Sequence, residues 1–304
     1  MPKQDIVVIG ASSGGLEALK ILASGLPENL KASVFVVLHI GPGIDGRSVL
    51  PQILTRAGPL AAVHSAEIEE IRCGRIYVAR PDLHMILTDG HVRAVHGPKE
   101  NRTRPAINPL FRSAAAIYGP RVTGVILSGL QDDGVVGLAE IKRRGGAVVV
   151  QEPSTALFPT MPQNAIQHVA PDYVLAPEQI AETITKLAVT DRAAKTIEEP
   201  MERKLLETRC PECAGPFWEE RQGNIVEYHC RVGHTYSPLT LKDENQDSVE
   251  RSLWASVVAL ENAAVLSDRL VAVLGQDSAR EAQEMRAQAQ AIREMLNGSK
   301  PADK

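Results

Sequence analysis

The sequence of 304 residues is poor in aromatic side chains, since Phe, Trp and Tyr together make up only 4%. This scarcity argues against a stacking platform for single-stranded nucleic acid, which needs aromatic rings. Neither sign of charge dominates, because the formal net charge is -4 and the pI is near 6.1. A protein that coats nucleic acid is therefore not expected. No apolar run approaches the roughly 20 residues of a membrane helix, so membrane insertion is not expected either.

The sequence also shows no pattern of a leader segment, and it contains few cysteines. The opening MPKQDIVVIG has no basic leader or apolar signal core and enters a predicted strand at once, so we expect a cytoplasmic protein. The length predicts about two domains of roughly 150 residues each. Only four cysteines are present, and three of them lie between Cys210 and Cys230. This uneven distribution indicates a local role for the three.

Residues 1–188 alternate between short β-branched runs and helical patterns. The runs that predict parallel strands, buried on both faces, are Ile6–Ile9, Val34–Leu38, Val122–Leu127 and Ala147–Gln151. The predicted helices are Leu16–Ser24, Ser48–Ala57, Asn108–Tyr118, Val135–Arg144 and Pro177–Leu187. Three further runs, Arg75–Ala79, Met85–Thr88 and Val92–Val95, predict antiparallel strands, with a hairpin turn at Asp89-Gly90. The predicted fold is α/β, a doubly wound and mainly parallel sheet with an antiparallel hairpin.

The pattern changes after residue 188. Residues 189–207 are charged, lack a strand signal and predict a linker. Residues 208–240 contain the three cysteines and predict a small zinc-ribbon-like module. Residues 241–304 predict an α-helical hairpin with a break at Gly275. The apolar stripe of this hairpin could pack on its own domain, bind a regulator or mediate self-association.

Polar side chains follow three of the predicted parallel strands, where ligands bind in open α/β sheets. Ser12 and Ser13 follow the first strand, His39 follows the second, and Asp132 and Asp133 follow Val122–Leu127. Their convergence predicts a Ser-His-Asp hydrolase, because a serine hydroxyl needs an imidazole to take its proton and a carboxylate to orient that imidazole. The residues alone do not choose within the serine pair or the aspartate pair.

Other interpretations of these residues stay open. The turn GASSGG could cradle a phosphate, although it lacks the G-x-G-x-x-G spacing and the GK[ST] ending. His39 could be a buried histidine with a structural role, and one of the two aspartates could cap the following helix. The joint placement of all three residue types favours catalysis. At the start of a helix, backbone N–H groups could also receive a developing oxyanion.

Several motifs in a fixed order resemble the catalytic domain of the CheB protein-glutamate methylesterase family. They are IGASSGG, VLHIGPG, RPAINPLFRSAA and LSGLQDDGVVGL, and the resemblance covers about residues 4–188. It implies hydrolysis of glutamyl methyl esters on the cytoplasmic helices of methyl-accepting chemotaxis receptors, with release of methanol and no catalytic cofactor. Deamidation of receptor glutamines is also implied. The resemblance assigns Ser12 as the nucleophile, His39 as the base, Asp133 as its partner, and backbone N–H groups near Ser13 as the oxyanion site.

The sequence also departs from the pattern of this family. Gln131 stands where the resemblance implies a glycine. The first predicted strand begins near residue 5, so we expect no receiver domain before it. Activation by phosphorylation in cis is therefore not expected. Three arginines, Arg102, Arg104 and Arg112, could line a groove for acidic receptor helices or simply form surface ion pairs. Two alternative functions stay open: a regulatory binding module that retains the esterase fold, and an esterase or amidase acting on a protein substrate outside chemotaxis. Another methylated protein could likewise be the partner in place of a receptor.

The cysteine cluster predicts a metal site. Two thiols in a C-x₂-C knuckle and a later C-x₃-H pair are typical of a closed structural zinc site. The predicted ligands are Cys210, Cys213, Cys230 and His234. His229 is an alternative fourth ligand, although its position beside Cys230 makes the spacing less suitable. Cys73, far from the cluster, is expected to be a buried apolar residue.

Overall fold

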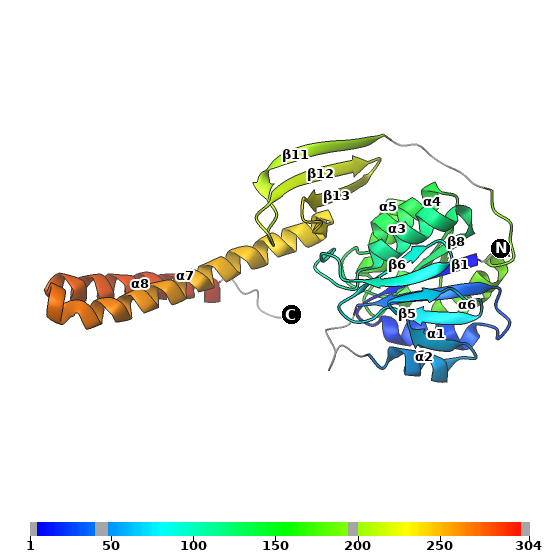
Figure 1. Ribbon diagram of the computed structural model, residues 1–304, viewed down its shortest axis with the longest axis horizontal. Helices are drawn as coiled ribbons and strands as arrows, with labels where there is room; N and C mark the ends of the chain where they lie inside the picture. Colours follow the sequence, from blue (N-terminus) through cyan, green and yellow to red (C-terminus); the bar gives the residue numbers. More distant parts are fainter. Residues whose placement is uncertain (1–4, 40–47, 194–199, 299–304) are drawn as a thin grey trace. The chain divides into compact units, whose positions relative to one another are not determined.

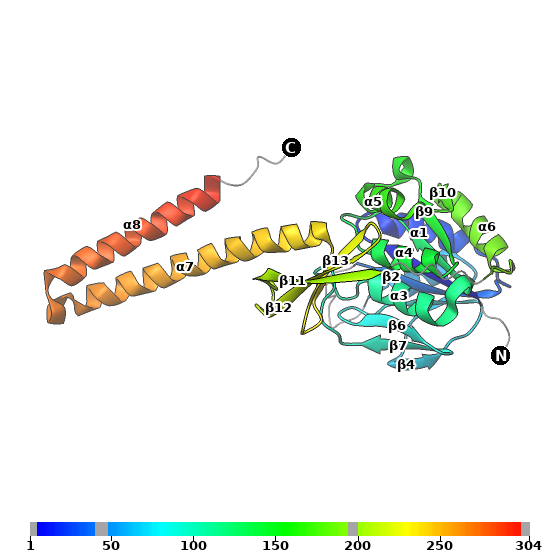
Figure 2. The same ribbon diagram turned by 90° about the horizontal axis from the view of Figure 1, so that it is seen from above.

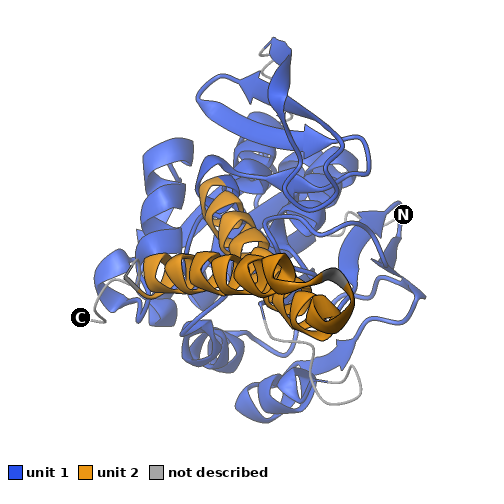
Figure 3. Ribbon diagram, turned by 90° about the vertical axis from the view of Figure 1, so that its left-hand side faces the viewer, with its two compact units in different colours: residues 1–241 blue, residues 242–304 orange. Residues whose placement is uncertain are grey.

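The computed structural model describes residues 5–39, 48–193 and 200–298 (Figure 1). The chain divides into two compact units, residues 1–241 and 242–304, which are coloured separately in Figure 3. Within the described ranges, no helix combines the length and the hydropathy that crossing a lipid bilayer would require. Residues 40–43 of the VLHIGPG motif lie outside the described residues.

A seven-stranded parallel sheet forms the centre of the first unit. Its strands are β1 (Asp5–Ala11), β2 (Ala32–Leu38), β3 (Ala61–His64), β5 (Arg75–Val78), β8 (Val122–Ile126), β9 (Ala147–Gln151) and β10 (Tyr173–Leu175). Their order is β10-β9-β8-β1-β2-β5-β3, and every neighbouring pair is parallel. The predicted doubly wound, mainly parallel sheet is confirmed. The three strands followed by candidate catalytic residues, β8, β1 and β2, are direct neighbours.

Helices cover both faces of this sheet (Figures 1 and 2). The helices of one face are α1 (Gly15–Gly25), α2 (Leu50–Ala57) and α6 (Pro177–Leu187); those of the other are α3 (Ile107–Tyr118), α4 (Val135–Arg143) and α5 (Thr160–Val169). Short 3₁₀ turns are Gly119–Arg121 and Pro153–Thr155. Alternate residues of β2 enter the two cores, since Val34 and Val36 belong to one cluster and Phe35 and Val37 to the other. Burial on both faces explains why these strands have continuous apolar sequences.

A separate three-stranded antiparallel sheet contains β4 (Ile68–Glu70), β6 (His84–Thr88) and β7 (His91–Val95). The hairpin predicted at Asp89-Gly90 joins β6 to β7. The prediction that Arg75–Ala79 is antiparallel is wrong, because β5 pairs in parallel with β2 and β3. Its side chains enter both cores: Tyr77 stacks on Phe35 at 5.1 Å between ring centroids, whereas Ile76 lies in the opposite core.

The remainder of the first unit is a four-stranded antiparallel sheet, which we call the Cys3His module (residues 201–241). Its strands are β11 (Met201–Arg209), β12 (Pro216–Gln222), β13 (Ile225–Cys230) and β14 (Thr235–Tyr236). The predicted linker therefore ends too late, because residues 201–207 belong to β11. Almost every residue of β11 is exposed, so its sequence has no apolar alternation. It pairs with β12, and Arg203 stacks over the Trp218 ring at 4.8 Å.

Two helices, α7 (Pro238–Leu274) and α8 (Gln276–Gly298), form the predicted helical hairpin. Gly275 separates them with φ +87, a left-handed conformation that glycine adopts without steric cost. The ion pair between Arg293 and Glu261 spans 2.6 Å, and Arg286 pairs with Asp268. The later residue of α7 pairs with the earlier residue of α8, and the earlier with the later, so the two helices are antiparallel.

Candidate active site

The ends of two neighbouring strands fix the candidate nucleophile and base. Ser12 follows β1 directly, and its backbone N–H donates to the carbonyl of Ser128 at 3.0 Å. His39 follows β2 directly, and its backbone N–H donates to the carbonyl of Ala11 at 3.0 Å. Ladder hydrogen bonds thus continue past the strand ends and hold both residues at one edge of the sheet.

The side chains of Ser12, His39 and Asp133 form a continuous chain of polar contacts. His39 Nδ1 lies 3.3 Å from Ser12 Oγ, and His39 Nε2 lies 2.8 Å from Asp133 Oδ2. The Asp133 carboxylate favours the His39 tautomer that carries the imidazole proton on Nε2. Nδ1 is then free of its proton and can accept the one on the serine hydroxyl, as general-base catalysis requires.

The carboxylate of Asp133 also sits at the start of α3. Its Oδ2 accepts a hydrogen bond from the backbone N–H of Ile107 at 2.6 Å, and its Oδ1 accepts from Asn108 N–H at 3.4 Å and from Asn101 Nδ2 at 2.9 Å. The first N–H groups of a helix have no partner within the helix and attract negative charge. Burial alone would raise the pKa of Asp133, but the hydrogen bond and charge of His39, followed by the Ile107 and Asn101 donors, lower it below its usual value.

The adjacent Asp132 has a different environment. Its Oδ1 accepts a hydrogen bond from Ser237 Oγ at 2.5 Å, and burial raises the pKa of its carboxyl to about 6. The structure therefore brings Asp133 to His39 and directs Asp132 to the Cys3His module. Likewise, Ser12 reaches His39, whereas the carbonyl of Ser13 accepts a hydrogen bond from Ser128 Oγ at 2.9 Å.

Three supporting residues were missed by sequence reasoning. Asn108 Oδ1 accepts the N–H groups of Gly134 (3.1 Å) and Gly137 (2.9 Å) at the start of α4. His84 contacts the carbonyl of Pro98 (2.8 Å) and the N–H of Ala106 (3.2 Å), which fixes both ends of the segment 98–106. Asn101, within that segment, donates to Asp133. The position of Asn108 at the predicted start of a helix is a weak sequence signal of a supporting role. No local sequence pattern marks Asn101 or His84 as supporting residues.

Gln131 has a left-handed backbone with φ 63, and its carbonyl accepts a hydrogen bond from Asn164 Nδ2 at 2.7 Å. Glycine, which the family resemblance implies at this position, adopts this conformation without steric cost, whereas side chains with a Cβ are disfavoured in it. We expect Gln131→Gly to raise the free energy of unfolding by about 1 kcal/mol relative to Gln131→Ala, which retains the strained Cβ. Urea unfolding of both variants measures this difference, and equal stabilities would contradict it.

Two of the three arginines that could line a groove are held in ion pairs. Arg104 binds Asp82 through its Nε and Nη2 atoms, at 2.9 and 2.7 Å. Arg112 is shared between Glu100 (2.5 Å) and Glu227 (3.2 Å). Both guanidinium groups are already paired with carboxylates of this chain, so the alternative of ion pairing describes them better. Arg102 is half-buried, with a left-handed φ of 66.

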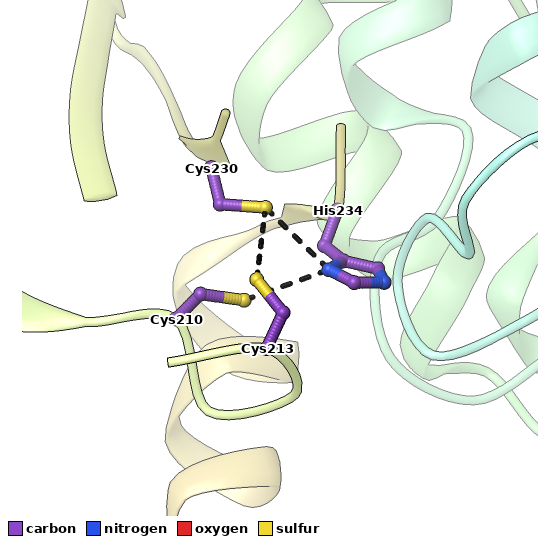
Figure 4. A group of neighbouring side chains, drawn as sticks. All are labelled: Cys210, Cys213, Cys230 and His234. Carbon is purple, nitrogen blue, oxygen red and sulfur yellow. Dashed lines mark hydrogen bonds between the residues drawn. The ribbon is translucent and has the colours of Figure 1, made fainter. Parts of the chain in front are cut away.

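The predicted metal ligands converge in the Cys3His module (Figure 4). The ligand atoms of Cys210, Cys213, Cys230 and His234 all lie within 4.8 Å of one another. Cys213 Sγ is 3.7 Å from Cys230 Sγ, and His234 Nδ1 is 3.4 Å from Cys230 Sγ. A tetrahedral zinc ion separates two sulfur ligands by about 3.8 Å and a sulfur and a nitrogen ligand by about 3.5 Å. These four residues therefore fit a tetrahedral metal ion.

The alternative ligand His229 belongs to another network. Its Nδ1 lies 3.1 Å from Thr235 Oγ1, and its Nε2 lies 3.5 Å from Glu220. His234 Nε2 lies 3.7 Å from Glu212, a carboxylate that could orient the imidazole of a ligand. Cys73 is exposed, so the expectation that it is buried is wrong. It stands in the turn just before β5, where the chain lies at the surface.

Comparisons with known proteins match the parallel-sheet region. The model of the CheB methylesterase family matches residues 7–184. A relative from Leptospira interrogans, provisionally named a protein-glutamate methylesterase/protein-glutamine glutaminase, is 38% identical over 184 residues, which is 60% of this chain and 94% of the relative. A Pyrococcus abyssi protein-glutamate methylesterase/protein-glutamine glutaminase is 35% identical over 190 residues, 61% of this chain and 51% of that protein.

A solved structure is also similar to part of the chain. The crystal structure of the Thermotoga maritima CheB methylesterase catalytic domain gives a TM-score of 0.57 at 32% identity and covers 60% of this chain and 98% of that domain. The family model, over residues 7–184, leaves the Cys3His module and the helical hairpin outside its match. The family model spans more than half of the chain, in the region that carries Ser12, His39 and Asp133, and the chain therefore belongs to the CheB methylesterase family.

Proposed function

We propose that this protein hydrolyses glutamyl methyl esters on the cytoplasmic helices of chemotaxis-type receptors and releases methanol. Deamidation of receptor glutamines follows the same chemistry, because an amide is attacked in the same way as an ester. The observation that carries the proposal is the chain of contacts from Ser12 through His39 to Asp133 at the carboxyl ends of neighbouring strands.

The roles of the residues follow from this geometry. His39 Nδ1 takes the proton of Ser12 as the hydroxyl attacks the ester carbonyl, and the ionised Asp133 stabilises the imidazolium that results. Backbone N–H groups near Ser13, at the start of α1, stabilise the oxyanion. His39 then protonates the departing methoxide, and a water molecule hydrolyses the glutamyl ester of Ser12 with the same assistance.

The experiment that tests this function is a methanol-release assay on methylated receptor, run on the wild type beside Ser12→Ala. Methanol release that disappears in the variant supports the proposal. A folded wild type that releases no methanol would favour the alternative of a binding module, and release from a different methylated protein would favour another substrate.

Zinc is the metal that suits the Cys3His cluster best. Three thiols and one imidazole are the usual donors of structural zinc, and four protein ligands close the coordination shell. Burial raises the pKa of the Cys210 thiol to about 11, so a cation is needed to hold the thiolate form at neutral pH. A bound zinc ion supplies folding energy to the module and performs no step of the ester hydrolysis.

We expect the purified chain to contain about one zinc ion, and Cys210→Ser to lose it because three ligands hold zinc far less tightly than four. Elemental mass spectrometry on both proteins measures this stoichiometry. Cys73→Ser is the matched control, since Cys73 is an exposed cysteine outside the cluster. A metal-free wild type with a folded module would exclude the site.

A further inference from the structure

Asn101 connects the candidate catalytic aspartate to the Cys3His module. Its Nδ2 donates to Asp133 Oδ1 at 2.9 Å, while its Oδ1 accepts from the backbone N–H of Ser237 at 2.8 Å and from Thr240 Oγ1 at 2.9 Å. The N–H of Ser237 can only donate, so it identifies the oxygen end of the amide, and the NH₂ end faces the carboxylate. Asn101 is 3% exposed, which leaves little room for water to replace these partners.

The backbone around Asn101 is held by the same segment of the module. The N–H of Asn101 donates to the carbonyl of Thr235 at 2.8 Å, and the N–H of Thr235 points to the carbonyl of Lys99 at 3.5 Å. Asn101 has a left-handed backbone with φ 48, a conformation that needs support from its surroundings. Residues 235–240 therefore fix both the backbone and the side chain of this asparagine.

This supporting segment begins next to a candidate metal ligand. Thr235 directly follows His234, and the carbonyl of His234 accepts the N–H of Cys230, another ligand, at 3.0 Å. The described interior of the module is small, with Phe217 and Tyr236 as its large buried side chains. A module with so little core depends on its metal to fold.

We propose that Asn101 is a positioning residue for the ester hydrolysis, and that metal binding by the Cys3His cluster determines how well it positions Asp133. The inference rests on the proposed esterase function. With metal bound, residues 235–240 hold Asn101 against the carboxylate. When the metal is removed, the segment loosens and the carboxylate loses one of its donors. The imidazole of His39 is then less well oriented, so turnover falls while the binding of substrate is unchanged.

The first test compares three states of the full-length chain: zinc-loaded, stripped with a chelator, and stripped with Zn²⁺ added back. We expect kcat for methanol release to fall about tenfold on stripping, with KM unchanged, and to recover with Zn²⁺, because loss of alignment slows the reaction step. A second readout is the NMR signal of the His39 Nε2 proton in protein labelled with ¹⁵N-histidine, assigned by its loss in His39→Gln. We expect this signal to shift on stripping and to return with Zn²⁺.

The second test changes the hydroxyl of Thr240, which donates to Asn101 Oδ1 and also contacts the backbone N–H and the hydroxyl of Ser237 in the same supporting segment. Thr240→Val removes the hydroxyl that donates to Asn101, whereas Thr240→Ser keeps it. Neither substitution touches a metal ligand, so both variants should retain zinc. We expect Thr240→Val to lower kcat about threefold at constant KM, and Thr240→Ser to match the wild type.

Each outcome decides the proposal. Metal-free protein with full kcat and an unshifted His39 signal would overturn it. Should the loaded wild type release no methanol, the proposed function fails, and the His39 signal alone decides whether the metal and Asp133 are coupled. Circular dichroism shows whether stripping unfolds the whole chain. If it does, the comparison of Thr240→Val with Thr240→Ser decides, and equal kcat values for these two zinc-retaining variants would overturn the coupling.

Discussion

Replacing Ser12 with alanine is expected to lower the rate of methanol release at least about 10³-fold, because no covalent intermediate can form without the hydroxyl. The fold should be unaffected. Ser12 is half-buried, and its backbone hydrogen bond to Ser128 does not involve the side chain. The measurement is steady-state methanol release from methylated receptor, with urea unfolding to confirm that stability is retained.

Ser13→Ala is the matched control for this prediction. Ser13 neighbours Ser12 in the same turn, but the contact to His39 comes from Ser12. Any contribution of Ser13 to the oxyanion site is through its backbone, which alanine retains, so the control should keep activity within about threefold of the wild type. Full activity of Ser12→Ala together with inactivity of Ser13→Ala would reverse the assignment of the nucleophile.

Asp133→Asn is the second change with a large expected effect, a loss of about 10³- to 10⁴-fold in kcat. Both carboxylate oxygens accept hydrogen bonds, from His39 and Ile107 on Oδ2 and from Asn101 and Asn108 on Oδ1. The asparagine amide has an NH₂ group in place of one carboxylate oxygen. Whichever way the amide is turned, this NH₂ group faces hydrogen-bond donors and cannot accept from them. The His39 tautomer is no longer fixed, and buried N–H groups lose their acceptor. We also expect a loss of about 1–3 kcal/mol in the free energy of unfolding, measured with urea.

Asp132→Asn distinguishes the two aspartates. An asparagine there still offers an oxygen to Ser237 Oγ and leaves the contact between Asp133 and His39 untouched. We expect kcat to change by no more than about threefold. If Asp132→Asn were as damaging as Asp133→Asn, the orienting role would belong to the pair and not to Asp133 alone.

The sequence was sufficient to predict the sheet and the location of its candidate site. Strands such as β2 are apolar on both faces because helices cover both, and that pattern is visible without coordinates. Polar residues at the ends of three such strands must converge if the strands are neighbours. Local pattern alone left Asp132 and Asp133 undistinguished, and only the family resemblance assigned Asp133. The structure supplies the physical reason, since it is the Asp133 side chain that lies against His39 and the start of α3.

Two predictions that were wrong, the direction of Arg75–Ala79 and the end of the linker, share one physical origin, which is pairing between segments distant in sequence. The direction of β5 depends on its partners β2 and β3, and four residues carry no signal of direction. Strand β11 is mostly exposed and is held by β12, so its sequence is typical of a charged linker. The ion pair that was the alternative for Arg112 likewise has a distant partner in Glu227, 115 residues away along the chain. Local patterns cannot show such partners.

The hydrogen bond between Asn101 and Ser237 has a consequence for the order in which the protein matures on the ribosome. The two residues are 136 positions apart, and Asp132 precedes Ser237 by 105. Contacts of such separation form late, because closing a long loop costs entropy before any contact is made. At about 5–20 residues per second, the parallel sheet emerges several seconds before the segment that supports its carboxylate. In the proposed coupling, a nascent chain therefore carries an assembled but weakly supported triad until synthesis passes residue 240 and the metal is bound.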